Sequence, residues 1–155
     1  MALRYIFNPM KEKFLYETLP HRLKYFAEKT PNKTAFVFYS TALEWTTLSF
    51  QELYYRSLTF AKGLRVLGIS PDDIVALLDS RCPEWLTCYF GIIMAGAIVL
   101  GMRFSSKEEV KYTVKMSVYN VMIIFSSGHN GLNENIIKTF VSKTNFSGEI
   151  VLLRT

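Results

Sequence analysis

Residues 74–100 read IVALLDSRCPEWLTCYFGIIMAGAIVL, and this stretch indicates the fold of the chain. It opens with an apolar run of strand length at 74–78 and closes with a second run at 97–100. Between the two runs, Pro83 favours the start of a helix that continues to about Ala95, where a glycine follows. A strand, a helix and a strand in this order predict a βαβ unit with parallel strands.

The same stretch also has the hydropathy of a membrane span, because residues 85–102 are 18 residues without a charge. Three glycines interrupt this segment, and β-branched residues follow Gly96. A buried helix that ends at a glycine and leads into a buried strand has the same hydropathy. We therefore expect a helix and a strand here and no transmembrane span.

The rhythm of apolar strands continues towards the C-terminus, with runs at 121–125 and 150–153. Counted from residue 74, the four strand starts are separated by 23, 24 and 29 residues. A capping box at 105–109 and a capping residue at Asn133 each predict a helix between strands. Strands that are apolar throughout predict an α/β fold, a doubly wound and mostly parallel sheet with helices on both faces.

The segment before this sheet predicts helices and a hairpin. Residues 1–17 suggest an irregular arm, and Thr18 can cap a helix whose buried face holds Leu19, Leu23, Phe26 and Ala27. Residues 34–48 are expected to form a β-hairpin. Ser49 and Glu52 form a capping box. The helix that it opens is expected to bury Leu53, Ser57, Phe60, Ala61 and Leu64, and to end at Gly68.

Composition narrows the class of protein. The chain has 155 residues, of which 50% are hydrophobic and 20% charged, as in one globular domain or a piece of a larger one. Its net charge is +5, but +4 of this lies in residues 1–33. The rest of the chain therefore lacks the basic stripe that would indicate binding of nucleic acid. Cys82 and Cys88 are too few for a disulfide scaffold and suggest reduced thiols in an intracellular protein. Its location is expected to be cytoplasmic or mitochondrial, since residues 1–11 carry two basic residues and no acid, as in an organelle transit peptide.

Two segments follow predicted strands and are the best candidates for a site. Asp79, Ser80 and Arg81 come directly after the strand at 74–78, where open α/β sheets bind ligands, although Asp79 is more readily explained as a helix cap. Residues 126–131 read SSGHNG, and their amides could bind an anion. The next lysine is Lys138, so an ordinary strand-to-helix loop is the favoured interpretation.

The remaining chemistry is sparse. Gly91 and Gly96 have the spacing of a phosphate loop, but Ala97 stands where such a loop needs a lysine, so we expect close helix packing instead. His21 and His129 lack neighbouring Cys or acids at ligand spacing and are expected to be ordinary surface residues. The sequence thus assigns no catalytic, cofactor-binding or metal-binding residue.

Several short motifs nevertheless occur in a familiar order. The chain contains TPNKTA at 30–35, LSFQEL at 48–53, AKGL at 61–64, LGI at 67–69, DIVAL at 73–77, PEW at 83–85 and MAGAI at 94–98. In this order and spacing they resemble the N-terminal part of the adenylate-forming superfamily, which includes acyl-CoA synthetases, luciferases and the adenylation domains of peptide synthetases. The resemblance covers residues from about 18 to 153 and is closest to medium-chain fatty acyl-CoA synthetases.

This resemblance implies that residues 18–155 are the N-terminal portion of an AMP-binding domain. Family members activate a carboxylic acid with ATP and pass the acyl group to a thiol, usually coenzyme A. ATP, Mg and coenzyme A are thus implied for a full-length enzyme, with a fatty or other carboxylic acid as substrate. The family's phosphate loop and catalytic lysine would lie beyond Thr155, so we expect the chain alone to bind no cofactor and to be inactive. Two stretches, 80–82 and 100–104, depart from the family pattern.

Other classes of function stay open at this point, including whether the chain by itself is an enzyme. The fold could serve as a non-catalytic interaction module, in which the rest of a synthetase or another protein covers the exposed sheet. It could also be a small nucleotide-binding α/β protein. Binding of ATP without a carboxylic acid would distinguish that last class.

Overall fold

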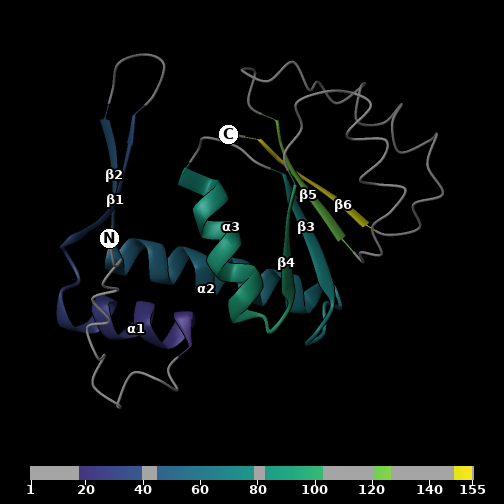
Figure 1. Ribbon diagram of the computed structural model, residues 1–155, viewed down its shortest axis with the longest axis horizontal. Helices are drawn as coiled ribbons and strands as arrows, with labels where there is room; N and C mark the ends of the chain where they lie inside the picture. The colour runs from purple at the N-terminus through teal and green to yellow at the C-terminus, as the bar shows by residue number, and fades with distance from the viewer. Residues whose placement is uncertain (1–17, 40–44, 79–82, 103–120, 127–148, 155) are drawn as a thin grey trace, which may run out of the picture.

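The computed structural model describes residues 18–39, 45–78, 83–102, 121–126 and 149–154 (Figure 1). The arm expected at 1–17 and the helices expected after 105 and after 133 lie outside these residues. The described elements, in chain order, are α1 (Leu19–Lys29), β1 (Thr34–Tyr39), β2 (Trp45–Ser49), α2 (Phe50–Val66), β3 (Ile74–Leu78), α3 (Pro83–Met94), β4 (Ile98–Met102), β5 (Val121–Ser126) and β6 (Glu149–Arg154).

Four of the strands form one sheet in the order β4-β3-β5-β6, and every neighbouring pair is parallel. Ile74 lies opposite Ile98, Leu77 opposite Ile123, and Ser126 opposite Arg154. The predicted parallel α/β sheet is therefore confirmed. β1 and β2 form a separate antiparallel hairpin, also as predicted.

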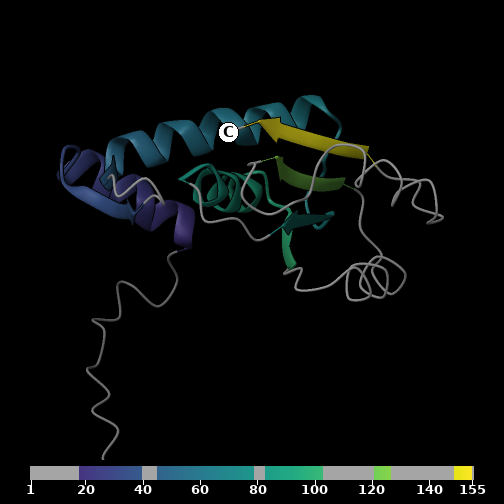
Figure 2. The ribbon, with the colours of Figure 1, turned by 90° about the horizontal axis from the view of Figure 1, so that it is seen from above.

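The sheet order shows where the chain changes direction. From β3 the chain passes through α3 to β4 on one side, and β5 then pairs with β3 on its other side. α3 contacts β3 and β4 and lies against one face of the sheet, with α1 and α2 on the same side of the molecule (Figures 1 and 2). Right-handed connections place helices on opposite faces when the direction of winding reverses. The order is thus that of a doubly wound sheet.

The main core lies between α2, α3 and β3. The side chains of Val75, Leu77 and Ile92 are fully buried there, and Cys88 is a buried thiol on the same face of α3. Apolar runs in β3 and α3 are consistent with this burial, since a strand covered on both faces needs no polar residue. The hydrophobic stretch of 85–102 is thereby accounted for as helix and strand.

A second, smaller core joins α1 and the hairpin to α2. Leu23, Leu48 and Leu53 come from these three parts and are buried together. Phe26 of α1 stacks on Phe50 at the start of α2, with ring centroids 5.1 Å apart. The N-terminal elements are therefore held to the sheet through α2 and α3.

Both long helices end as the sequence predicts. Gly68 and Gly96 have φ values of 89° and 83°, in the left-handed region that favours glycine. The amides of Ile69 and Ala97, one residue later, donate to the carbonyls of Leu64 and Ile92 at 3.0 and 3.1 Å. These bonds form the motif in which glycine satisfies the last free carbonyls of a helix.

Three details of the prediction are wrong. The Thr18 hydroxyl does not cap α1 but lies 3.2 Å from Nδ1 of His21. Leu19, expected to be buried, lies at the first position of α1 and is 53% exposed. Ala97 is not in β4: its amide still closes the end of α3, so strand pairing starts at Ile98.

No helix among the described residues is both long and apolar enough to cross a membrane.

Candidate ligand-binding edge of the sheet

The carboxyl ends of the four parallel strands meet at one edge of the sheet. In register, β3 and β4 end together at Leu78 and Met102, and β5 and β6 end together at Ser126 and Arg154. The chain winds away from the neighbours β3 and β5 in opposite directions. Such a reversal leaves a crevice outside the strand ends, which is where open α/β sheets bind ligands.

The two segments singled out in the sequence follow these two strands. Asp79, Ser80 and Arg81 come after β3, and residues 127–131 come after β5; all of them, with His129, lie outside the described residues. Pairing of Val75 with Val121 and of Leu77 with Ile123 makes β3 and β5 direct neighbours. The sequence alone identified both segments but did not show that their strands are adjacent.

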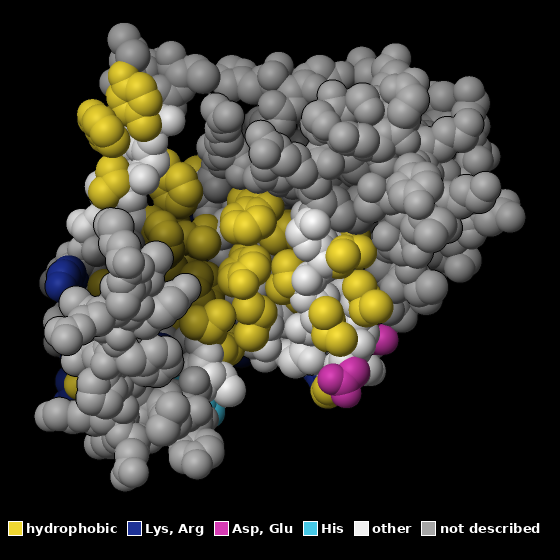
Figure 3. All heavy atoms as spheres, in the orientation of Figure 1, with side chains coloured by type: hydrophobic (Ala, Val, Ile, Leu, Met, Phe, Trp, Pro, Cys, Tyr) yellow, Lys and Arg dark blue, Asp and Glu magenta, His cyan; other side chains and the backbone are white. Residues whose placement is uncertain are grey.

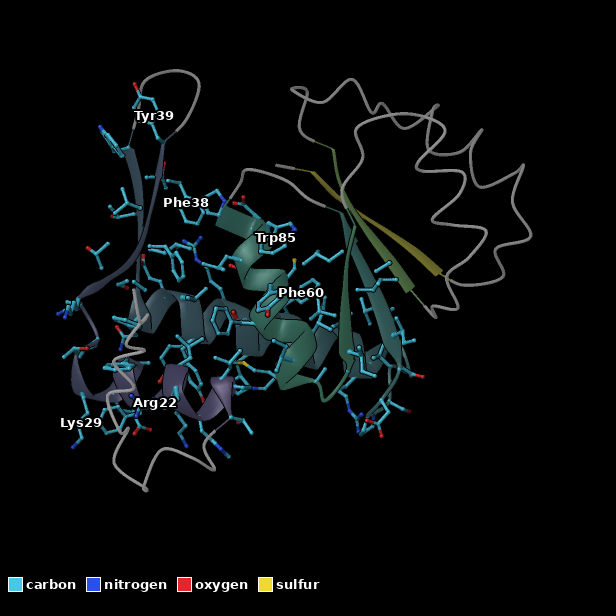
Figure 4. The ribbon with its side chains drawn as sticks, in the orientation of Figure 1. Arg22, Lys29, Phe38, Tyr39, Phe60 and Trp85 are labelled. Atoms are coloured by element: carbon cyan, nitrogen blue, oxygen red, sulfur yellow. The ribbon has the colours of Figure 1, made fainter. Side chains whose placement is uncertain are left out.

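α3 begins beside this edge and carries Trp85. The sequence did not identify the indole N–H of this residue as a candidate polar group. Trp85 lies in the first turn of α3 and stacks on Tyr89, with ring centroids 5.5 Å apart and ring planes at 19° (Figure 4). Its indole Nε1 is buried and finds no acceptor among the described residues. The only sequence signal for Trp85 was its position directly after Pro83 and Glu84, a pair that favours the start of a helix.

Gly91 serves close helix packing, as predicted, whereas Gly96 has a different role. A Cβ placed on Gly91 would lie 2.7 Å from Cδ1 of Phe60 and 2.9 Å from the carbonyl oxygen of Ser57. α2 and α3 therefore approach each other too closely for any other residue at this position. Gly96 ends α3 and lies beside Pro71. Neither glycine belongs to a phosphate loop.

His21 lies exposed on α1, bonded to Thr18 as described above. In the part of the chain that the structure describes, no group of three or more His, Cys, Asp or Glu residues is arranged to hold a metal ion.

A shallow groove of about 580 Å³ lies at the opposite edge of the sheet, where β3 and β4 begin. Its basic side chains are Lys62 and Arg65, and the Arg65 guanidinium already donates to the carbonyl of Ile69 at 3.1 Å. The full lining is Leu58, Ala61, Lys62, Arg65, Val66, Pro71, Met94, Ala95 and Gly96. Because this groove is open and lies far from the strand ends, we place the candidate site at the carboxyl edge instead.

Comparison with known proteins places the fold in a family. The family model described as "AMP-binding enzyme" matches residues 23–151. A plipastatin synthase of Bacillus subtilis (strain 168) is 29% identical over 138 residues, which are 88% of this chain and 3% of that protein. The long-chain-fatty-acid–CoA ligase heimdall of Drosophila melanogaster is 33% identical over 101 residues, 63% of this chain and 15% of that protein.

A solved structure supports the same conclusion at the level of the fold. The anthranilate CoA ligase AuaEII in complex with anthranoyl-AMP superposes with a TM-score of 0.73 at 23% identity. The match covers 93% of this chain and 27% of that one, so the chain spans about a quarter of that ligase and smaller shares of the curated relatives. Since the family model matches most of the chain, the protein belongs to the AMP-binding enzymes, the family of adenylate-forming ligases.

Proposed function

We propose that residues 18–155 are the N-terminal portion of the adenylation domain of an acyl-CoA synthetase. The observation that carries this proposal is a parallel sheet with a reversal between β3 and β5, inside a segment that matches the family. A complete enzyme of this kind would join a carboxylic acid, here a fatty acid, to AMP and then to coenzyme A. It would use ATP and Mg, and the free thiol of Cys88 fits the cytoplasm or mitochondria.

The choice of an acyl-CoA product rests on the relatives. One relative is a fatty-acid–CoA ligase, and the superposed structure is a CoA ligase. Within this proposal, we further expect the fatty acid substrate to be of medium chain length.

We expect residues 1–155 alone to lack activity for a physical reason. Adenylation requires cationic donors around a triphosphate whose charge increases in the transition state. The glycine-containing segment at 126–131 has no lysine before Lys138, and Lys62 and Arg65 lie at the opposite edge of the sheet. The described residues thus offer no cluster of cations beside the candidate site.

The test is exchange of labelled pyrophosphate into ATP, with and without fatty acids of several chain lengths. The purified 155-residue chain should give no more exchange than a heat-killed control, whereas the longest natural form of the protein should give fatty-acid-dependent exchange. Carboxylate-dependent exchange by residues 1–155 would contradict the expected inactivity. A long form that exchanges only with amino acids would contradict the acyl-CoA assignment.

One observation favours a second candidate, a non-catalytic interaction module. β4 is an edge strand of the described sheet, and Ile98 at its start is half exposed. Uncovered sheet edges pair readily with other chains. If light scattering shows a compact monomer and that monomer binds no apolar dye, the result would argue against an interaction module. Binding of ATP without a carboxylic acid would instead favour a small nucleotide-binding protein.

A further inference from the structure

The β1–β2 hairpin contacts the rest of the described chain through one face. Cross-strand partners share a face, so Phe36 and Phe38 lie with Leu48 and Thr46 on this side. Leu48 is buried, and Phe38 packs against the small core and points towards α3 (Figure 4). The ring of Phe36 is nevertheless 41% exposed. The described chain therefore covers only part of this inner face.

The outer face of the hairpin is apolar as well. Val37, Tyr39 and Trp45 lie on it together with Thr47, and these three side chains are 55%, 52% and 69% exposed. The Tyr39 and Trp45 rings contact each other, with centroids 4.6 Å apart. Figure 3 shows hydrophobic side chains gathered on the hairpin. We call Val37, Tyr39 and Trp45 the outer strip.

The composition of the hairpin is that of strands covered on both sides. The outer face of an antiparallel pair is normally polar, and exposed strands usually carry charges that prevent association. The strands TAFVFY and WTTLS contain no charged residue at all. A two-stranded hairpin is also only marginally stable until further structure packs on it. The hairpin therefore needs a neutral, apolar surface against its outer strip.

The relatives of the chain indicate where such a surface comes from, because they are several times longer than the chain. This chain covers 27% of the superposed CoA ligase and 15% of the fatty-acid–CoA ligase from Drosophila melanogaster. In Figures 1 and 2 the last described strand, β6, runs towards the side of the molecule that carries the hairpin. Chain that continues from β6 would thus start on that side.

We propose that the outer strip is an internal interface of a longer ligase, covered by a part of the same polypeptide that follows residue 155. The proposal rests on the proposed function, because only a complete adenylation domain supplies that chain. An uncharged strip of one aliphatic and two aromatic side chains fits intramolecular packing, in which apolar surface is removed from water for good. The hairpin would then join the N-terminal elements to the later part of the domain.

The test compares the 155-residue chain with the longest natural form of the protein by hydroxyl-radical footprinting and mass spectrometry. Tyr39 and Trp45 should be oxidised rapidly in the 155-residue chain, where their rings are exposed. In the longer form they should be oxidised several-fold more slowly. Each rate is divided by the rate of the same residue in urea, which corrects for its intrinsic reactivity. This comparison needs no variant and therefore does not depend on whether a variant folds.

A double substitution then measures what the strip contributes in each form. Val37→Thr/Trp45→Thr should leave the urea midpoint of the 155-residue chain nearly unchanged, since both side chains already face water. The same change should clearly lower the midpoint of the longer form, because it removes buried apolar contacts and buries a hydroxyl group.

The matched control is Tyr55→Gln/Val66→Gln on α2. These two side chains are 58% and 87% exposed, and they lie one turn from Glu52 and Lys62, which are exposed and charged. A face with such neighbours is expected to stay in water. The control should therefore leave the urea midpoint of both forms nearly unchanged.

The outcomes separate this proposal from the proposed function. Equal oxidation of the strip in both forms, in a longer form that retains fatty-acid-dependent pyrophosphate exchange, would overturn the internal interface alone. Equal loss of stability in the hairpin and control variants would do the same. If the protein has no form longer than 155 residues, the proposed function and the interface both fall. Protection of the strip in the 155-residue chain that grows with protein concentration would instead make it an interface between copies.

Discussion

At the scale of single residues, Gly91 determines how closely α2 and α3 pack. The backbone carbonyl of Ser57 lies 2.9 Å from the place of a Cβ, and a carbonyl in a helix cannot move away without breaking the helix. Ser57 itself is fully buried, and its hydroxyl has no partner among the described residues. The contact therefore depends on a small residue on each helix.

This contact gives the first prediction. Gly91→Ala should destabilise the folded chain by about 1–3 kcal/mol through overpacking. Gly63→Ala is the matched control, since Gly63 lies inside α2 with no atom within 4 Å of a new Cβ. The control should stabilise the chain by about 0.5–1 kcal/mol through helix propensity. Urea unfolding followed by circular dichroism measures both, and equal effects of the two substitutions would contradict the packing argument.

The sequence predicted the packing role of Gly91 but not its cause. A missing lysine at 97 was enough to exclude a phosphate loop. That the neighbour is Phe60, from a helix about thirty residues earlier, depends on how α2 crosses α3, and no local pattern contains that information. The buried indole of Trp85, which finds no acceptor among the residues described, could not be predicted for the same reason.

At the scale of elements, the start of α2 depends on a capping box. The amide of Glu52 donates to the Ser49 hydroxyl at 3.2 Å, and the Glu52 carboxylate accepts from the Ser49 amide at 2.9 Å. Two hydrogen bonds to its carboxylate hold the pKa of Glu52 below the ordinary value of 4.5. The Ser49 amide has the larger effect and the Ser49 hydroxyl the smaller one. Ser49→Ala should cost about 1 kcal/mol of stability.

The lowered pKa of Glu52 gives a prediction about pH. Its contribution to folding is complete above pH 4.5, where the unfolded chain is also ionised, and is lost as pH falls through the lower pKa of the folded state. Glu52→Gln keeps a capping partner but cannot titrate. The stability difference between the wild type and this variant should therefore shrink below pH 4.5. Urea midpoints at several pH values test this, and a difference independent of pH would contradict it.

Most elements could be predicted because their signals are local. The capping box, the two terminal glycines and the apolar runs each specify an element within a few residues of sequence. The errors arose where tertiary contacts decide, as for Leu19, which lies exposed at the first position of α1. The amide of Ala97 could either close the end of α3 or pair with a neighbouring strand, and in the structure it donates to the helix carbonyl of Ile92.

At the scale of the whole molecule, the order β4-β3-β5-β6 brings β3 and β5 together and defines the carboxyl edge. Sequence spacing predicted parallel strands but not which strands are neighbours, because pairing is a long-range property. The candidate site could therefore be assigned to strand ends in general, and only the sheet order identifies the pair that matters. That Val37, Tyr39 and Trp45 share one face of the hairpin was likewise evident only from the strand register.

The most direct test of the account is to capture the native protein from the cells that make it, using an antibody raised against residues 1–155. The polypeptide should be several-fold heavier than 17.9 kDa, and the captured protein should catalyse fatty-acid-dependent exchange of pyrophosphate into ATP. That result would place this sheet inside an acyl-CoA synthetase. A captured polypeptide of 17.9 kDa, with no heavier form and no exchange, would contradict the proposed function.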